Sequence, residues 1–370
     1  MKYNWQQPDW LRFTYDLQEI EDVLFSFAEE TGHITGMLNV MSKESQTETL
    51  VNMMVSEAIK TSEIEGEYIN REDVVSSIRN NLGLNKEHTK VKDKKAQGIG
   101  SLMVDVRQTY QEPLTKEKLF QWHEMLMMGS QGIQTGTWRS HEEPMQVISG
   151  AAGKEKIHFE APPSKQIPKE MDKFILWFND TAPNGNKEIK KAPVRSAIAH
   201  LYFESIHPFE DGNGRIGRAI AEKALSQTLK RPVLLSLSKT IEGNKRSYYH
   251  ALEIGQRSNR ITPWVKYFTE TTLLAQRQAR EWIDFTLKKT RFFDLFKDQL
   301  NERQLKVVRR MFEAGPEGFE GGMRASKYVS LAKTSKATAT RDLQHLVEIK
   351  ALLTEGGGRS VRYILNAEIS

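Results

Sequence analysis

Apolar residues recur along most of the chain at the spacing of an amphipathic helix. Residues 15–40 show this clearly, because their apolar side chains lie three or four positions apart, at Leu17, Ile20, Leu24 and Phe27. The same pattern predicts further helices over residues 46–64, 70–80, 91–110, 114–127, 167–179, 192–206, 215–229 and 263–287. We therefore expect a mainly α fold.

One segment departs from the helical pattern. Residues 144–163 read PMQVISGAAGKEKIHFEAPP, in which two runs that favour strands, 145–148 and 156–159, flank a tip of Gly, Ala and Lys at 149–155. A Pro-Pro pair ends the segment, and helices resume after it. This pattern predicts a β-hairpin with a loose loop.

The C-terminal part changes character again. Its pattern predicts three helices, over 302–313, 325–332 and 335–348, and then a pair of strands around the sequence EGGGRS. This order of elements is typical of a winged-helix module, which we place at residues 300–370.

The positive charge of the chain is concentrated in this module. Residues 301–370 contain 12 Lys and Arg and 8 Asp and Glu, which accounts for +4 of the total net charge of +5. Five basic residues and no acidic residue lie from Arg324 to Arg341. Two interpretations stand beside each other: the module binds DNA through its third helix, or it serves protein contact or dimerisation.

Composition narrows the class of protein. The 370 residues are 38% hydrophobic, which is enough for two or three domains. The absence of cysteine excludes disulfides and thiolate chemistry. The first residues, MKYNWQQPDW, have no apolar signal segment, and the most apolar run, MDKFILWFN, is too short and too charged to span a bilayer. We expect a cytoplasmic protein with no membrane contact.

Residues 207–218, HPFEDGNGRIGR, concentrate groups that bind phosphate. Gly212 and Gly214 allow a tight turn and a close approach of the backbone to a ligand, and a helix starts directly afterwards. The first amides of a helix lack internal partners and carry partial positive charge, so this turn suits an anion. Arg215 and Arg218, three positions apart, add two guanidinium groups for further phosphates.

Two more groups in this segment suggest a reaction. Asp211 lies beside the predicted phosphate site, where a carboxylate is suited to bind Mg²⁺. His207 precedes it by four residues and can act as a general base near neutral pH. Metal-bound phosphates, positive groups and a base together describe nucleotidyl transfer to a hydroxyl.

The segment resembles the signature of the Fic domain family, HPFx[D/E]GNGRxxR, at every fixed position. The resemblance implies a protein adenylyltransferase that transfers AMP from ATP–Mg²⁺ to Ser, Thr or Tyr hydroxyls of a target protein. It implies His207 as the catalytic base and Asp211 as the Mg²⁺ ligand. The implied nucleotide-binding residues of the signature are Asp211, Gly212, Asn213, Gly214, Arg215, Ile216, Gly217 and Arg218.

Two other segments resemble parts of the family site. The predicted hairpin resembles the flap that pairs with an extended target segment. Its second strand supplies Ile157, His158, Phe159 and Glu160. The sequence NKRSYYHALEIGQ resembles the segment beside the adenine, which assigns nucleotide contacts to Tyr248, Tyr249, Leu252 and Gln256.

Residues 61–66, TSEIEG, resemble the inhibitory motif of the family, [S/T]xxxE[G/N]. On a helix, Thr61 and Glu65 share one face, and Gly66 ends the helix or permits close approach. The position before the signature resembles the class with an N-terminal inhibitory helix. The resemblance therefore implies that Glu65 pairs with Arg218 and keeps it from the γ-phosphate.

The resemblance also implies an organisation and several partners. It places a helical extension with the inhibitory helix at 1–95, a Fic catalytic core at 96–288 and the winged helix at 300–370. The target protein is not named by the sequence, and self-modification and a homodimer are compatible with it. Two alternatives stay open: a de-AMPylase that uses the same site, and a nucleotide-sensing regulator that binds DNA.

Overall fold

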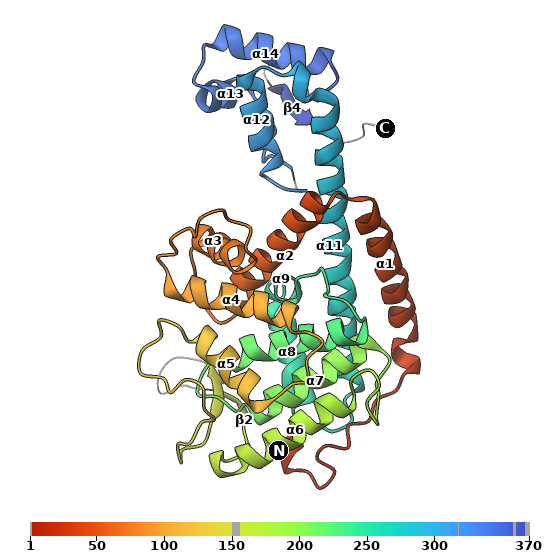
Figure 1. Ribbon diagram of the computed structural model, residues 1–370. Helices are drawn as coiled ribbons and strands as arrows, with labels where there is room; N and C mark the ends of the chain where they lie inside the picture. Colours follow the sequence, from red (N-terminus) through yellow and green to blue (C-terminus); the bar gives the residue numbers. More distant parts are fainter. Residues whose placement is uncertain (1, 150–155, 317, 358–359, 367–370) are drawn as a thin grey trace. The chain divides into compact units, whose positions relative to one another are not determined.

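The computed structural model describes residues 2–149, 156–316, 318–357 and 360–366 (Figure 1). Within these residues the chain is mainly helical, with two antiparallel two-stranded sheets, β1–β2 and β3–β4, as the apolar pattern predicts. The chain forms two compact units, Met1–Gly32 with Leu50–Arg277 and His33–Thr49 with Gln278–Ser370. Among the described residues, no helix is long and apolar enough to cross a membrane.

The first unit contains most of the elements. Three helices have residues in both units: α1 (Glu21–Val40), α2 (Lys43–Ile64) and α11 (Thr262–Phe296). The other elements of the first unit are α3 (Arg71–Asn81), α4 (Lys94–Gln108), α5 (Lys116–Leu126), β1 (Gln146–Ser149), β2 (Lys156–Glu160), α6 (Ile167–Asp180), α7 (Ala192–Ile206), α8 (Asn213–Thr228), α9 (Leu237–Glu242) and α10 (Lys245–Gly255), with short 3-10 turns at Asn4–Gln6, Gln18–Ile20 and Ser164–Gln166.

Helix α7 lies at the centre of this unit, and every one of its residues is buried. The sequence APVRSAIAHLYFESI is apolar on nearly all sides, which is the pattern of a helix surrounded by protein. α7 packs against α8, and Gly217 permits the close approach, because a Cβ there would lie 2.4 Å from Glu204 Oε1. Arg195 is tolerated inside because its guanidinium donates to the carbonyls of Phe178 and Ala224 and to Gln227 Oε1.

The predicted hairpin is confirmed as the pair β1–β2, with Val147 opposite Phe159 and Ile148 opposite Ile157. An irregularity between Val147 and Ile148 shifts the register by one residue. Residues 150–155, which make up most of the predicted loop at the tip of the hairpin, lie outside the residues that the structure describes.

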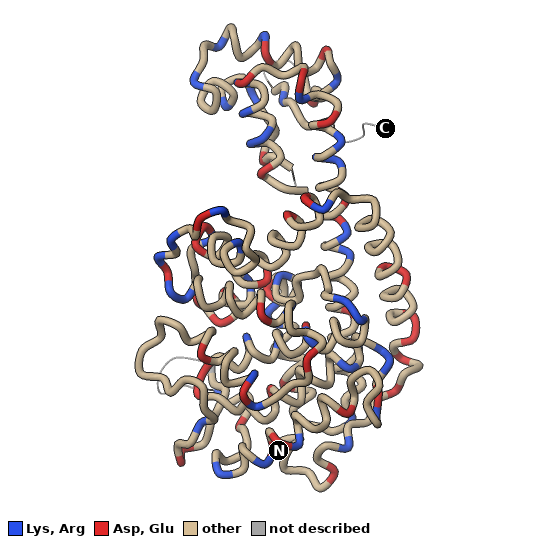
Figure 2. Tube along the Cα trace, in the orientation of Figure 1, with Lys and Arg blue, Asp and Glu red and all other residues tan. Residues whose placement is uncertain are grey.

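The second unit ends in α12 (Glu302–Phe312), α13 (Ala325–Ala332), α14 (Lys336–Glu348), β3 (Leu352–Glu355) and β4 (Arg362–Leu365), after a 3-10 turn at Lys297–Gln299. This is the predicted winged-helix order. Its core contains Val308, Phe312, Tyr328, Leu343 and Leu346. Figure 2 shows basic positions on each of α12, α13 and α14.

Two helix ends differ from the sequence-based prediction by more than five residues. α11 continues to Phe296 instead of ending at residue 287, because Phe292 and Phe296 pack in the core of the second unit. The charged run KKTR before them hides this apolar spacing in the sequence. α1 begins at Glu21 instead of residue 15, because Asp16 Oδ1 accepts a hydrogen bond from Gln18 N and starts a 3-10 turn.

Candidate active site

The loop between α7 and α8 carries the predicted base. His207 follows α7 in the left-handed conformation (φ 53°, ψ 61°), and Gly212 (φ 81°) precedes α8. Glycine adopts this conformation freely, whereas histidine adopts it only where the surroundings constrain it. The Asn213 side chain provides one constraint, since it accepts from Phe209 N and donates to Phe209 O, both at 2.9 Å.

The loop is also anchored in the protein interior. Phe209 is fully buried and stacks on His123 with ring centroids 4.1 Å apart. Arg139 donates from Nε to His207 O at 2.8 Å and from its backbone N to Pro208 O at 2.9 Å. Burial lowers the pKa of Arg139 to about 10, so the guanidinium stays charged at neutral pH. These contacts set the position of the His207 ring.

A cavity of about 780 Å³ opens beside this loop, a volume in the range of small-molecule sites. It collects many of the predicted site residues from four parts of the chain: the end of α2, the hairpin, the α7–α8 loop and the region of α10. Those that line it are Glu65, His158, Phe159, His207, Asp211, Gly212, Asn213, Gly214, Tyr248, Tyr249 and Gln256, together with Leu252. The remaining predicted residues, Thr61, Gly66, Ile157, Glu160, Arg215, Ile216, Gly217 and Arg218, are not in its lining.

The start of α8 gives the cavity its anion-binding character. The first-turn amides of this helix have no partner within the helix, and they follow directly on Gly212. Asp211 is half-exposed and its Oδ1 accepts from Gly212 N at 2.6 Å. Within the described residues, no cluster of three or more acidic or His side chains could hold a metal ion.

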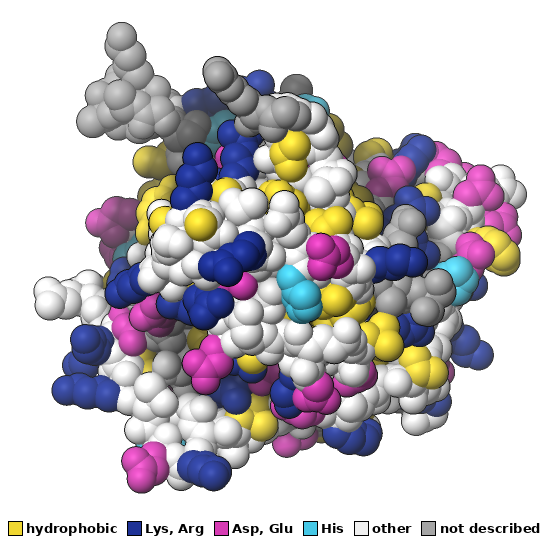
Figure 3. All heavy atoms as spheres, turned by 90° about the horizontal axis from the view of Figure 1, so that it is seen from above, with side chains coloured by type: hydrophobic (Ala, Val, Ile, Leu, Met, Phe, Trp, Pro, Cys, Tyr) yellow, Lys and Arg dark blue, Asp and Glu magenta, His cyan; other side chains and the backbone are white. Residues whose placement is uncertain are grey.

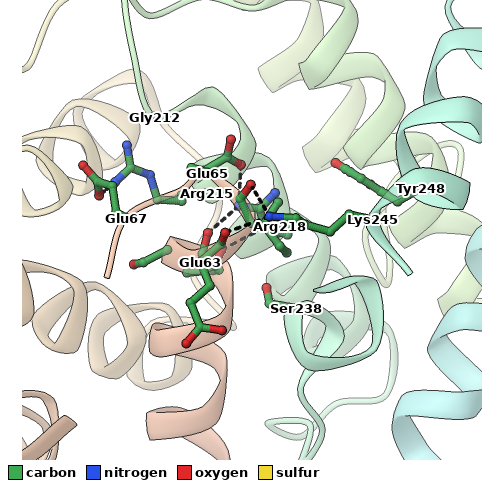
Figure 4. Close-up of polar contacts among 12 residues, drawn as sticks. Glu63, Glu65, Glu67, Gly212, Arg215, Arg218, Ser238, Lys245 and Tyr248 are labelled. Atoms are coloured by element: carbon green, nitrogen blue, oxygen red, sulfur yellow. Dashed lines mark hydrogen bonds and ion pairs between the residues drawn. The ribbon is translucent and has the colours of Figure 1, made fainter. Parts of the chain in front are cut away.

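Arg218 is engaged by the end of α2 (Figure 4). Its Nη2 donates to Glu65 Oε1 at 2.7 Å and to Thr61 O at 3.0 Å, and its Nε donates to Thr61 Oγ1 at 2.8 Å. The guanidinium is 1% exposed; burial by itself lowers the pKa of Arg218, but the Glu65 carboxylate outweighs this effect and raises it. The pair that the resemblance implies is therefore present.

Arg215 has a carboxylate partner on the same segment. Its Nη1 donates to Glu67 Oε2, and its Nη2 lies 3.5 Å from Asp211 Oδ1. Glu67 also accepts from Lys95 Nζ at 2.8 Å. Gly66, with φ 79°, separates Glu65 from Glu67 in the turn after α2. The two acids thus contact the two arginines of the signature.

The end of α2 is also tied to α10. Lys245, the first residue of α10, donates from Nζ to Glu63 O at 2.9 Å and to Ile64 O at 3.2 Å, as Figure 4 shows. A lysine at these carbonyls is favourable because the last turn of a helix has unpaired acceptors and partial negative charge. The contact links the segment that carries Glu65 to the helix that carries Tyr248 and Tyr249.

The predicted adenine-side residues differ in accessibility. Tyr249 is 41% exposed, whereas Tyr248 is 1% exposed and its hydroxyl lies 2.8 Å from His200 Nε2. Gln256 is buried and donates to Glu204 O at 3.2 Å. Tyr249 is therefore the aromatic ring best placed to contact a ligand, and Tyr248 and Gln256 also pack the wall.

The second strand of the hairpin divides its side chains between two environments. Ile157 is 46% exposed, whereas Phe159 is 1% exposed and packs edge-on against Tyr3 at 5.0 Å. Glu160 Oε2 accepts from Gln146 Nε2 at 2.9 Å, across the hairpin. His158 Nδ1 lies 3.3 Å from Glu253 Oε2 on α10.

Several residues that shape the site were not found from the sequence. Arg139 and Lys245 act through contacts with distant backbone carbonyls, for which the sequence contains no local signal. Glu67 and Glu204 could have been identified from their spacing in the sequence. Glu67 stands two positions after Glu65, and Glu204 stands one helical turn before His207.

Comparison with known proteins places this site in a family. Residues 113–225 match the Fic/DOC family, and residues 3–84 match a domain of unknown function, DUF4172. Among curated relatives, the chain is 29% identical over 102 residues to a protein adenylyltransferase Fic of Drosophila mojavensis, a match that covers 28% of this chain and 18% of that protein. It is 24% identical over 161 residues to a protein adenylyltransferase Fic of Nematostella vectensis, covering 44% of this chain and 33% of that protein. The matches thus span a third or less of these relatives.

Solved structures share the fold. A Fic family protein from Desulfovibrio desulfuricans G20 matches 94% of this chain and 97% of its own with a TM-score of 0.53 at 21% identity. A Fic domain containing signaling protein from Bacteroides thetaiotaomicron VPI-5482 matches 69% of this chain and 95% of its own, also with a TM-score of 0.53, at 17% identity. The hairpin, the α7–α8 loop and the family match agree in pointing to one conclusion: residues 113–225 of this chain form a domain of the Fic/DOC family.

Proposed function

We propose that this chain is a protein adenylyltransferase that transfers AMP from ATP to a hydroxyl of a target protein. The observation that carries the proposal is the cavity in which His207, Asp211 and the start of α8 meet. A base, a carboxylate and free helix amides in one cavity are the groups that nucleotidyl transfer requires.

In the proposed reaction, His207 takes the proton of the target hydroxyl. The hydroxyl oxygen forms a bond to the α-phosphorus, the bond from that phosphorus to the bridging oxygen of the β-phosphate breaks, and pyrophosphate leaves. The amides of Asn213 and Gly214 are placed to donate to phosphate oxygens, and Arg215 and Arg218 would bind the outer phosphates once Glu67 and Glu65 release them.

The residues present fit Mg²⁺. This ion commonly binds one or two carboxylates together with phosphate oxygens and water, and the half-exposed carboxylate of Asp211 beside the start of α8 matches that need. When bound, Mg²⁺ neutralises part of the negative charge of the phosphates.

The test uses the Glu65→Gly variant, in which Arg218 loses its carboxylate partner. We incubate it with a cell lysate, Mg²⁺ and ATP labelled at either the α- or the γ-phosphate. We expect protein-bound label from α-labelled ATP only, and loss of labelling when EDTA removes the metal. Transfer of the γ-label would indicate a kinase instead. If no α-label is transferred but AMP is released from an AMP-modified protein, the de-AMPylase alternative is correct.

The second candidate function, DNA binding by the winged helix, is favoured by one observation. All five basic residues from Arg324 to Arg341 are exposed, and no acidic side chain lies among them in the sequence. Figure 3, which views the molecule from above Figure 1, shows Lys and Arg side chains on the surface of this face together with acidic ones. A helix with a run of exposed cations is suited to DNA phosphates.

We expect the double variant Lys336→Glu with Arg341→Glu to bind a short random-sequence duplex about 10-fold more weakly than wild type, because each lost phosphate contact removes a charge-assisted interaction. Fluorescence anisotropy between about 50 and 200 mM KCl measures the affinity and its salt dependence. The control is Arg309→Glu with Arg310→Glu on α12, which changes the net charge equally. Equal loss in both double variants, or no binding by wild type, contradicts this function.

A further inference from the structure

Helix α7 contains a buried carboxylate that the proposed transfer does not use. Glu204 is 4% exposed, lies one turn before His207, and its Oε2 is 3.6 Å from His207 Nδ1. A buried acid is costly unless a partner compensates its charge, so its place beside the proposed base calls for a physical reason.

The orientation of the His207 ring supplies part of that reason. Nδ1 is buried and has no hydrogen-bond partner, while the side chain as a whole is 13% exposed and lines the cavity. Because the two ring nitrogens lie on different edges of the ring, a buried Nδ1 leaves the Nε2 edge toward the cavity. Nε2 is therefore the nitrogen that can meet an incoming hydroxyl.

Two histidines lie near Glu204, and His207 is the one whose ring lines the cavity. His200 is fully buried, and its Nε2 lies 2.8 Å from the Tyr248 hydroxyl. Burial lowers the pKa of His200, so this ring is neutral. Gly217 packs directly against Glu204 Oε1 and offers no side chain to it.

The charge of Glu204 is compatible with this role. Burial raises the pKa of Glu204, but the contact with His207 and the positive charge of Arg218 help to outweigh burial and lower it below the usual value. The carboxylate is thus ionised at neutral pH, when it can accept a hydrogen bond and stabilise a cation.

We propose that Glu204 is a positioning residue that accepts the Nδ1–H of His207 and thereby directs the Nε2 lone pair to the target hydroxyl. When Nε2 takes the hydroxyl proton, the ring becomes a cation and the carboxylate stabilises it, while Glu204 itself neither gains nor loses a proton. The distance of 3.6 Å is longer than a hydrogen bond, and such contacts commonly shorten when substrate binds. Only the expected effect of Glu204 on AMP transfer rests on the proposed function; the contact with His207 does not.

The test compares three proteins in the Glu65→Gly background: the parent, Glu204→Gln and Glu204→Leu. Glutamine preserves the shape but not the charge, and leucine has no acceptor for Nδ1–H. We expect kcat for AMP transfer to fall about 10- to 100-fold with leucine and less with glutamine, and KM for ATP to stay within about 2-fold, because the residue acts on the base and not on the nucleotide.

A second measurement does not depend on activity. The ¹⁵N–¹H spectrum of the His207 ring reports which nitrogen carries the proton, and we expect the Nδ1–H tautomer to dominate in the parent and to lose its dominance in Glu204→Leu. Glu222→Gln is the matched control, since Glu222 is equally buried, pairs with Arg107 at 3.2 Å and does not line the cavity. It should leave both the tautomer and KM unchanged.

The outcomes separate the two proposals. If the parent transfers no AMP but the tautomer still depends on Glu204, the proposed function fails and the positioning contact stands. If the tautomer is the same in Glu204→Leu as in the parent, or kcat falls no more than in Glu222→Gln, the positioning role is wrong. If Glu204→Leu does not fold, as judged by its thermal midpoint, Glu204→Ala, which has no acceptor either, carries the same two comparisons.

Discussion

Replacing His207 by alanine in the Glu65→Gly background is expected to lower AMP transfer by about three orders of magnitude, within the 10²- to 10⁴-fold contribution of a positioned general base. The expected loss is large because neither His200 nor His123 can replace His207, since both are fully buried. His158 also lines the cavity, but it lies on the hairpin, 3.3 Å from Glu253, and not on the α7–α8 loop. Transfer of label from α-labelled ATP to protein measures the loss.

The His207→Ala variant should still bind ATP, because the amides at the start of α8 and the arginines are untouched. Isothermal titration with a non-hydrolysable ATP analogue and Mg²⁺ therefore serves as its control, with an affinity within about 3-fold of the parent as the expected result. Loss of nucleotide binding together with transfer would mean that His207 shapes the cavity and is not the base.

The sequence was sufficient for the elements that depend on local periodicity. Most of the helices, the hairpin and the winged-helix order follow from apolar spacing and from turn residues, and the structure confirms them; the short helices α9 and α10 were not predicted. The end of α11 was missed because Phe292 and Phe296 become core residues only through contacts with the second unit's other helices. Periodicity cannot reveal apolar partners that are distant in the sequence.

The residues of the candidate site also divide into those that a local sequence pattern reveals and those that only distant contacts reveal. The signature is one continuous segment, so the loop with His207, Asp211 and Gly212 could be found from its order of residues alone. Arg139 could not, because a lone arginine carries no sign that it will donate to the His207 carbonyl. The pairing of Glu67 with Arg215 was missed because the inhibitory motif ends one residue earlier, at Gly66.

Glu65→Gly is expected to raise AMP transfer by about 10- to 100-fold, because it removes a charge-assisted contact of a kind that contributes about 1.5–3 kcal/mol. Arg218 then loses its only carboxylate partner among the described residues, although Thr61 still accepts two of its hydrogen bonds. Glu67 continues to engage Arg215, which limits the gain. Initial rates of labelling from α-labelled ATP measure the change.

The matched control for this prediction is Glu63→Gln. Glu63 lies two residues earlier, and its side chain pairs with Lys60 at 2.5 Å instead of contacting Arg218. It should leave the rate within about 2-fold of wild type, because a partly exposed pair of this kind contributes little. A similar rise in both variants would show that any weakening of α2 activates the protein, and that the Glu65 contact is not specific.

The Glu65→Gly substitution should also lower the thermal stability of the ligand-free protein and make that stability depend more strongly on bound nucleotide. Without Glu65, the guanidinium of Arg218 remains buried without the carboxylate that pairs with it directly, which costs free energy in the ligand-free state. Phosphates of bound ATP can replace that charge, so ATP–Mg²⁺ should raise the thermal midpoint more in Glu65→Gly than in wild type, where the carboxylate competes for the same group. Equal ATP-induced shifts in the two proteins would mean that Glu65 does not compete with nucleotide for Arg218.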